Sequence, residues 1–436
     1  MKTETYQQAI DYLFSQRAKG MKLGLDNIRN LTERLKHPEH RFPSIHIAGT
    51  NGKGSTVAIL ESILREAGYK SGRFISPHLK DMRERIQIRG RSITKKQVVE
   101  SLQRMKPHIE ATGASFFEIL TAMAFLHFSE NKVEIAVLET GLGGRLDATN
   151  VVTPLLTMIT EIGLEHTRIL GKRLESIALE KAGIFKPKIP CISGVTHWRA
   201  KTALSELALK RNVPLYFLKE LVRLSNLHLS EQMSQFDCDT GSSNYHDLTL
   251  RLIGKHQIHN AALALLAVEE LRKQGWNIPE QAIRNGLKKV QWRARLELLQ
   301  ENPKILLDSA HNPMSIQSLV KTLNSIFKYE KLILVFGVLK DKDYQKMFKE
   351  IGSLADSIVL TKPLNDRALD PEFLEHHPVT QGKPIDVIPD IQNAWTRALA
   401  LANKDDLICA AGSIYLVGEV LRFWEESEKE RHRSED

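Results

Sequence analysis

The segment that most constrains the fold of this chain lies between Arg41 and Gly68. An apolar run from Phe42 to Ala48 is followed by the glycine-rich turn GTNGKGS and then by apolar residues at helical spacing. This order predicts a buried strand, a tight loop and a helix that ends at Gly68. Such a loop offers backbone N–H groups and a helix N-terminus to an anion, so it is a candidate phosphate site.

Strand-like and helical segments alternate along the rest of the chain. Alternation of this kind predicts a parallel, doubly wound α/β sheet. We interpret the polar stretch 225–247 as an exposed loop or hairpin insertion. The helices are expected over 116–129, 258–272 and 280–288, and the strands over 72–75, 133–138, 155–160, 304–307, 332–336, 357–360, 386–388 and 407–410.

Length and pattern together predict two domains. At roughly 150 residues per domain, 436 residues allow two or three. We place the boundary in the segment 292–301, with a larger parallel-sheet domain over 1–295 that holds the phosphate loop and a smaller Rossmann-like α/β domain over 296–436. The charged tail EESEKERHRSED is expected to be a fraying helix end.

Composition narrows the class of protein. The three cysteines, Cys191, Cys238 and Cys409, are too few and too far apart for a disulfide framework or a cysteine-rich zinc site, which favours a reducing cytoplasm. We find no signal peptide and no apolar stretch of membrane-spanning length. The net charge is +9, but the basic residues are dispersed, so small polyanions are favoured over nucleic acid or a membrane, and a merely solvated surface is the alternative.

The phosphate loop departs from its common form. That form has Gly six residues before the lysine and Ser or Thr directly after it, whereas here Ile47 and Gly54 stand at those places and the hydroxyl comes at Ser55. Lys53 would supply the positive charge for β and γ phosphates. The alternative is a glycine-rich turn without a ligand, which the strand and helix on either side make the weaker interpretation.

A nucleotide site also needs oxygen ligands for Mg²⁺. Glu139 ends the apolar strand VEIAVLE, where a buried carboxylate is costly unless it is paired or bound to a metal. The alternative for Glu139 is a solvated strand end. His166, in GLEHTRILG, is a second candidate ligand, and its alternative is a surface or hydrogen-bonded core histidine.

Eight motifs occur in order between about Gly20 and about Gly418: HIAGTNGKGS, ISPHL, LETGLGGRLDATN, EHTRILG, EKAGIFK, WRARLE, LDSAHNP and FGVLKDKD. Together they resemble folylpolyglutamate synthase and dihydrofolate synthase, the folate branch of the Mur ligase family. The resemblance implies a P-loop ATPase domain followed by a Rossmann-like ligase domain. It also implies an ATP-dependent enzyme that adds L-glutamate to reduced folates and to dihydropteroate through an acyl phosphate, releasing ADP and phosphate.

Three alternatives accompany this interpretation. The enzyme would have only one of the two activities, or the chain would be a non-ligating ATP-binding switch. A muramyl ligase is disfavoured, because it would carry an extra N-terminal domain for a UDP-linked substrate and only about 40 residues precede the first expected strand. The resemblance further implies a cytoplasmic monomer.

The resemblance assigns roles to residues of this sequence. The catalytic residues are Lys53, Lys181 and His311. ATP is bound by Gly49, Thr50, Asn51, Gly52, Lys53, Gly54, Ser55, Asn260, Arg295 and Asp308. Two Mg²⁺ ions are held by Ser76, Glu139, His166 and Lys181, and the pterin-bearing substrate by Ser115, Phe116, Phe117, Glu118, Leu146, Asp147 and Ala148.

Several of these assignments keep an alternative. Lys181 would be N-carboxylated in the family, or a plain cation. Phe116 and Phe117 would stack on the pterin or belong to the core, with at least one expected to be buried. Asp308 would bind the ribose or anchor its loop. Two departures stand out: Ser309 where the family often has Gly, and Arg293-Ala294 where Pro-Gly is common.

Overall fold

The computed structural model describes residues 5–16 and 24–435, so the start of the resemblance near Gly20 lies outside the described residues. The chain forms two compact units. The first contains the described residues up to Leu227 together with 236–250 and 257–290. The second contains 228–235, 251–256 and the residues from Gln291 onward.

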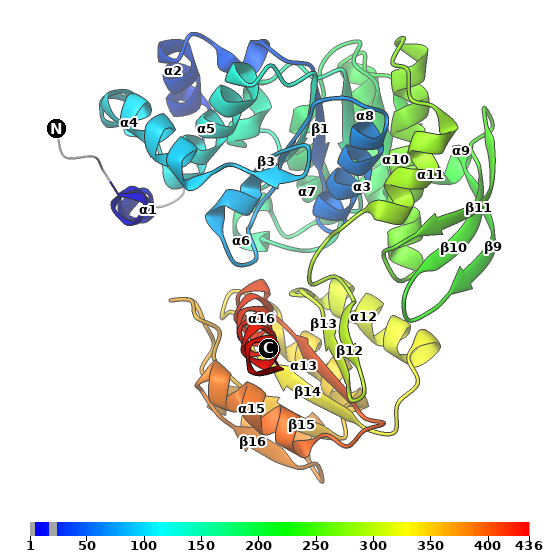
Figure 1. The fold of residues 1–436 in the computed structure, drawn as a ribbon. Helices are drawn as coiled ribbons and strands as arrows, with labels where there is room; N and C mark the ends of the chain where they lie inside the picture. The colour runs from blue at the N-terminus through cyan, green and yellow to red at the C-terminus, as the bar shows by residue number, and fades with distance from the viewer. Residues whose placement is uncertain (1–4, 17–23, 436) are drawn as a thin grey trace. The chain divides into compact units, whose positions relative to one another are not determined.

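The first unit is built on an eight-stranded sheet in the order β4-β3-β2-β5-β1-β6-β7-β8 (Figure 1). Strand β1 lies between β5 and β6 and pairs with both in parallel, while β3 and β4 form an antiparallel edge. The predicted parallel sheet is confirmed. The strands are β1 Ser44–Ala48, β2 Ser71–Phe74, β3 Ile86–Ile88, β4 Arg91–Ser92, β5 Ile135–Glu139, β6 Leu156–Ile159, β7 Cys191–Ser193 and β8 Leu215–Phe217.

Helix α3, which follows β1, is buried along most of its length. It packs against α11, where Gly286 permits a close approach: a Cβ there would lie 2.6 Å from the Cα of Ile63. The Ser62 hydroxyl also donates to the Gly286 carbonyl at 2.8 Å. The C-terminal half of α3 is thereby packed closely against α11.

The α-helices of this part of the chain range in length from 4 to 19 residues. They are α1 Tyr6–Ser15, α2 Asp26–Arg34, α3 Lys53–Glu66, α4 Lys95–Thr112, α5 Phe116–Glu130, α6 Thr167–Leu170, α7 Leu174–Lys181, α8 Trp198–Lys210, α9 Leu218–Leu221, α10 Lys255–Lys273 and α11 Glu280–Lys289. The 3₁₀ turns are η2 Pro38–His40, η3 Met82–Arg85, η4 Ala148–Val151 and η5 Ala182–Ile184.

The stretch 225–247 is mostly sheet, which agrees with the expected hairpin insertion and not with the alternative of an exposed loop. It contributes to strands β9 Arg223–Leu229, β10 Ser234–Asp239 and β11 Asn244–Leu250, which form a separate sheet in the order β11-β10-β9. Phe236 and Cys238 are buried, as are Tyr245 and Leu248. These buried apolar residues are separated by polar residues of the opposite face, so the composition of the stretch looks polar.

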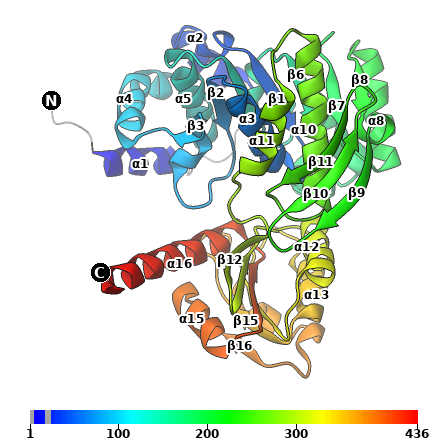
Figure 2. The same cartoon turned by 45° about the vertical axis from the view of Figure 1, so that its right-hand side comes forward.

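The second unit has a six-stranded sheet in the order β12-β13-β17-β14-β15-β16. Its strands are parallel except for β12, which pairs antiparallel with β13. Helices α12 and α13 lie on one face and α15 and α16 on the other (Figure 2). The elements are β12 Glu297–Glu301, β13 Lys304–Leu307, α12 Pro313–Ile326, β14 Leu332–Phe336, α13 Tyr344–Leu354, β15 Ser357–Leu360, α14 Glu372–Glu375, η6 Pro378–Thr380, β16 Ile385–Val387, α15 Ile391–Leu401, β17 Leu407–Ala411 and α16 Ile414–Glu435.

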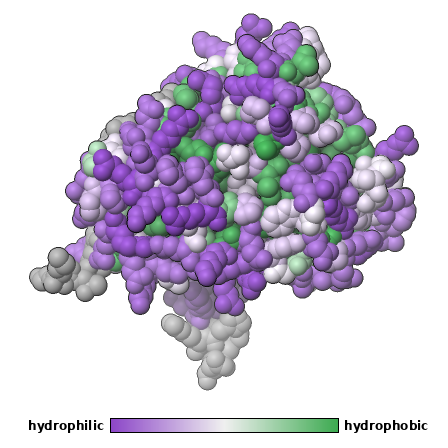
Figure 3. Space-filling view, turned by 90° about the horizontal axis from the view of Figure 1, so that it is seen from above, coloured by the Kyte–Doolittle hydropathy of each residue, from purple (hydrophilic) through white to green (hydrophobic). Residues whose placement is uncertain are grey.

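This second sheet confirms the expected Rossmann-like α/β fold, with parallel strands covered by helices on both faces. Figure 3 shows one face of the molecule as mainly hydrophilic, with hydrophobic residues in small groups. Within residues 5–16 and 24–435, no helix has the length and apolar composition needed to cross a membrane. All three cysteines are free and buried.

Candidate active site

The loop between β1 and α3 has the backbone of a phosphate-binding turn. Gly52 precedes α3 with φ +84, and Gly49 has φ +157. A Cβ at Gly49 would lie 1.8 Å from the Thr160 hydroxyl oxygen, and one at Gly52 would lie 2.5 Å from Asn260 Oδ1. Both glycines are therefore required by their neighbours as well as by their backbone conformation.

The outer side of this loop is held by the end of β6. The Thr50 N–H donates to the Glu161 carbonyl at 2.6 Å, and the Thr160 hydroxyl donates to the Asn51 carbonyl at 2.7 Å. The Thr50 hydroxyl also donates to the Gly163 carbonyl and accepts from the Gly163 N–H. These bonds fix the loop before any ligand arrives.

The helix N-terminus at this loop has no side-chain cap. Its first N–H groups have no intrahelical partner, because every α-helix leaves its first four donors unpaired. Lys53 is the first residue of α3, whereas we had treated it as part of the loop. An anion at this point would meet the helix dipole and an ammonium group together.

Two lysines converge on the carbonyl of Gly49. Lys53 Nζ donates to it at 3.1 Å and to the Thr50 carbonyl at 3.2 Å, and Lys181 Nζ donates to it at 2.6 Å. Lys181 ends α7 and is buried. Burial lowers the pKa of Lys181 to about 7, and the charge of Lys53 acts in the same direction, whereas Glu165 and Asp147 oppose it.

Glu139 ends β5 beside the same loop and is buried. Its Oε1 lies 3.9 Å from Lys53 Nζ, and its Oε2 accepts from the Ser76 N–H at 3.1 Å. The structure thus brings together Ser76, Glu139 and Lys53 from three segments of the chain. A buried carboxylate at a strand end, next to a hydroxyl residue, fits the oxygen donors that Mg²⁺ prefers.

His166 precedes the short helix α6 with φ +51, and its Nε2 lies 3.9 Å from Glu165 Oε1. The side chain of Glu165 is only 8% exposed, and its charge acts on Lys181. Glu165 was missed in the sequence, although an acidic residue beside a candidate metal-binding histidine was a usable signal. The metal role of His166 stays a prediction.

Asn260 lies in α10 and faces the phosphate loop, since its Oδ1 occupies the space next to Gly52. Its Nδ2 donates to Gln257 Oε1 at 3.0 Å. Asn260 therefore lies against the loop that we assign to ATP, and its contact with the nucleotide stays a prediction.

The segment Ser115–Glu118 forms the capping box that begins α5. The Glu118 carboxylate accepts from the Ser115 N–H and hydroxyl, each at 2.7 Å. The S-x-x-E pattern was a readable signal for this cap, and we missed it. Phe116 is buried, which confirms that at least one of the two aromatics belongs to the core. The Phe117 ring lies against Gly141, where a Cβ would be 2.5 Å from it.

The loop containing Leu146, Asp147 and Ala148 follows β5 and is shaped by the buried Asp147. Its Oδ1 accepts from the Thr149 N–H and hydroxyl, and its Oδ2 accepts from the Leu142 N–H. Burial raises the pKa of Asp147, and these hydrogen bonds oppose that rise. Asp147 therefore organises the loop internally, and contact of the loop with a pterin stays a prediction.

In the second unit, Asp308 follows β13 and anchors its own loop. Its Oδ2 accepts from the Leu296 N–H at 2.8 Å and its Oδ1 from the Ala310 N–H at 2.9 Å. Burial raises the pKa of Asp308, and the nearby Arg295 opposes the rise. The ring Nδ1 of His311 lies 2.9 Å from the Ser309 carbonyl. The charge of Arg295 thus acts on Asp308, and His311 lies in the turn that follows Asp308.

Family models match most of the chain. The Mur ligase middle domain matches residues 47–268, and the glutamate ligase domain of Mur ligases matches residues 294–414. The dihydrofolate synthase/folylpolyglutamate synthase of Bacillus subtilis is 38% identical over 428 residues, covering 95% of this chain and 98% of that protein.

Solved structures agree with the sequence comparison. The structure of Escherichia coli FolC in complex with DHPP and ADP matches with a TM-score of 0.88 at 29% identity, covering 96% of this chain and 98% of that one. A bifunctional folylpolyglutamate synthase/dihydrofolate synthase with Mn, AMPPNP and L-glutamate bound matches with a TM-score of 0.86 at 28% identity, covering 97% and 100%. Together with the phosphate loop and the paired domains, these matches show that the chain belongs to the dihydrofolate synthase/folylpolyglutamate synthase family of Mur ligases, which are ATP-dependent ligases.

Proposed function

We propose that the enzyme joins L-glutamate to reduced folates and to dihydropteroate at the expense of ATP. The observation that carries the proposal is the cluster around Gly49, where Lys53, Lys181 and Glu139 meet an uncapped helix N-terminus. A substrate carboxylate takes the γ-phosphoryl group to form an acyl phosphate, and the amine of L-glutamate then displaces phosphate. Such chemistry needs mainly positioning and charge neutralisation.

Each part of the cluster has a role in this scheme. The loop from Gly49 to Ser55 holds the phosphates, with Asn260 supporting it and Lys53 neutralising the charge that develops on them. In the second unit, we assign ATP binding to Arg295 and Asp308, and a catalytic role toward the acyl phosphate to His311. The segments 115–118 and 146–148 hold the pterin-bearing substrate.

A divalent metal bound here would neutralise the phosphate oxygens. We assign one Mg²⁺ to Ser76, Glu139 and His166, and a second to Lys181 after N-carboxylation. Carboxylation requires the neutral amine, and the pKa of about 7 at Lys181 supports it, because the neutral form is then abundant at slightly alkaline pH. An uncarboxylated Lys181 would act as a cation toward phosphate.

The roles of Lys181 are separated by chemical rescue. Lys181→Ala should lose most activity, and acetate should restore part of it only if the native ligand is a carboxylate. Crystals grown with Mg²⁺ and nucleotide should show a carbon and two oxygens on Lys181 Nζ. An unmodified ammonium in such a map would leave Lys181 as a simple cation.

The metal assignment of Glu139 has its own experiment. Glu139→Gln should need more Mg²⁺ for half-maximal activity, because an amide is a weaker ligand for a hard cation. A Mg²⁺ titration that overlays the parent enzyme would remove Glu139 from the ligand set.

The scope of the reaction is tested by offering dihydropteroate and tetrahydrofolate side by side, with mass detection of the products. ADP release should require both L-glutamate and the pterin-bearing acceptor, whereas a nucleotide switch would be indifferent to them. We also propose that the enzyme acts as a monomer in the cytoplasm, which light scattering of the purified protein and fractionation of the source cells would check.

A further inference from the structure

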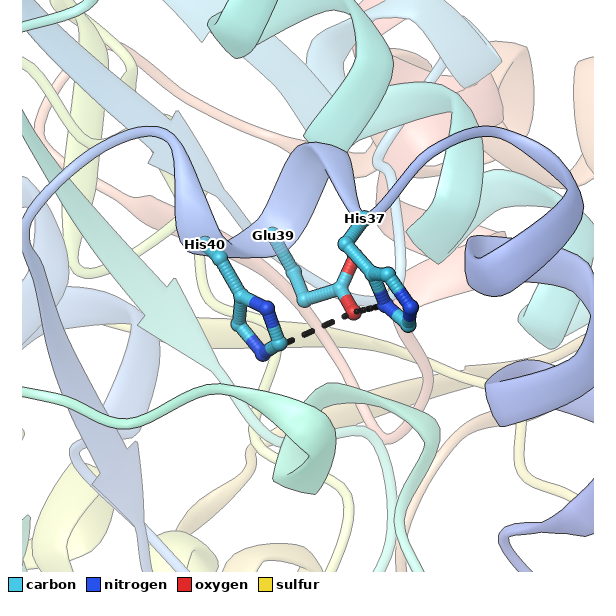
Figure 4. Close-up of side chains that lie close together, drawn as sticks. All are labelled: His37, Glu39 and His40. Carbon is cyan, nitrogen blue, oxygen red and sulfur yellow. Dashed lines mark hydrogen bonds and ion pairs between the residues drawn. The ribbon is translucent and has the colours of Figure 1, made fainter.

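The turn just before β1 carries a cluster outside the ATP site. Residues 37–40 read His-Pro-Glu-His, and their last three form η2. His37 Nδ1 lies 3.0 Å from Glu39 Oε1, and His40 Nε2 lies 3.8 Å from the same oxygen. Figure 4 shows the Glu39 carboxylate directed between the two imidazole rings. The ring planes are nearly parallel, at 13°.

The charge of Glu39 is poorly compensated by protein groups. Its side chain is 3% exposed, while the side chains of His37 and His40 are 50% and 56% exposed. Within the described part of the chain, its ion pairs are with these two histidines alone, and its buried Oε2 accepts no hydrogen bond. Burying a carboxylate without a cation is costly, so this position favours a bound positive charge.

The spacing of the donor atoms fits a small transition-metal ion. The three ligand atoms lie within 4.8 Å of one another. A tetrahedral ion with bonds of about 2.0–2.1 Å separates its ligands by about 3.3 Å, and the observed 3.0 and 3.8 Å lie on either side of that value. Two imidazole nitrogens suit Zn²⁺ and its neighbours, whereas Mg²⁺ prefers oxygen donors.

We propose that His37, Glu39 and His40 bind a divalent transition-metal ion of the Zn²⁺ type, with water completing the coordination. All three ligands come from one turn, so the bound ion would restrain the conformation of the segment that leads into β1. The site shares no residue with the Mg²⁺ ligands assigned above, and it does not depend on the proposed ligase reaction.

The experiment is a calorimetric titration of the untagged, metal-free full-length protein with Zn²⁺. A large excess of Mg²⁺ is present throughout, so that oxygen sites at the ATP loop are occupied. One equivalent of Zn²⁺ should bind to the parent protein. His40→Ala and Glu39→Gln should each weaken this event at least about tenfold. His228→Gln, which changes an exposed histidine on β9, is the matched control and should bind as the parent does.

Co²⁺ supplies a second measurement, because its visible absorption reports nitrogen and oxygen ligands in tetrahedral geometry. The band should appear with the parent and be absent from His40→Ala. Since His40 is largely exposed, that variant tests the proposal even where loss of the buried Glu39 carboxylate disturbs folding. Unchanged Zn²⁺ binding in a folded His40→Ala protein, or no binding by the parent under excess Mg²⁺, would overturn the proposal and leave a hydrogen-bonded histidine–carboxylate pair.

Discussion

Each unit contains a junction in which a buried strand leads through a short loop into a helix. The two junctions differ in whether side chains accept hydrogen bonds from the N–H groups at the start of the helix. At β1–α3 the helix has no side-chain cap, and glycines and lysines surround its N-terminus. At β13–α12 the donors are used internally: Asn312 caps the helix, and the Ser315 hydroxyl accepts from the N–H groups of His311 and Asn312.

The contrast shows how one local architecture serves two purposes. An uncapped N-terminus leaves its N–H groups available to an anion. At the second junction a capping box, with Pro313 in the first helical turn, satisfies these N–H groups within the protein and stabilises the helix. The first junction is therefore suited to bind phosphate. The second is suited to hold a rigid loop around His311.

The largest expected effect tests the β1–α3 junction, where the helix has no side-chain cap. Lys53→Ala removes the ammonium that lies between the loop carbonyls and Glu139. We expect turnover to fall by about 100- to 1,000-fold with little change in thermal stability, measured by coupled ADP release and calorimetry. Lys70→Ala, at a position outside this loop, is the control. If a folded Lys53→Ala protein released ADP at the rate of the parent enzyme, the assignment of this loop to phosphate binding would be wrong.

The next largest effect tests the β13–α12 junction, where Asn312 caps the helix. Asp308→Asn keeps the shape but turns one acceptor into a donor, so a backbone N–H of Leu296 or Ala310 loses its partner. The expected loss of stability is about 1–3 kcal/mol in urea unfolding. If Asp308 only anchors its loop, the KM for ATP should stay near the parental value in the folded protein. A large rise in that KM with unchanged stability would favour the ribose contact instead.

A smaller effect is expected at the cap of α12. Asn312→Ala leaves the Ser315 N–H without its 2.9 Å acceptor and should cost about 1 kcal/mol. Asn312→Ser retains a capping oxygen and should recover most of that loss. Equal destabilisation by both variants would mean that the cap contributes little.

The sequence predicted the α/β fold well because buried parallel strands are apolar runs bounded by glycines and polar residues. Strands 304–307, 332–336 and 357–360 were placed to the residue. What the sequence could not show is the hydrogen-bond partner of each polar side chain. Asp147, Glu118 and Asp308 each satisfy backbone N–H groups of their own loops, and such contacts depend on folding that residue type alone does not show.

The smallest expected effect concerns a departure from the family pattern. Ala294 stands where the family commonly has glycine, and its backbone is left-handed at φ +55. That conformation costs an L-residue roughly 1–2 kcal/mol. Ser309, the other departure, is absent from the positive-φ residues of the described chain, so its side chain brings no such strain.

Ala294→Gly should therefore stabilise the protein. Glycine removes the left-handed strain of the folded state. It also makes the unfolded chain more flexible, which favours unfolding by roughly 0.4–1 kcal/mol, less than the strain that is removed. The net gain should be about 0.5–1 kcal/mol in urea unfolding. The hydrogen bond from the Ser309 N–H to the residue 294 carbonyl would be retained, because it involves main-chain atoms alone. Ser309→Gly, which relieves no positive φ, is the matched control and should not stabilise. A destabilised Ala294→Gly protein would show that the buried methyl group contributes more through packing than it costs in strain.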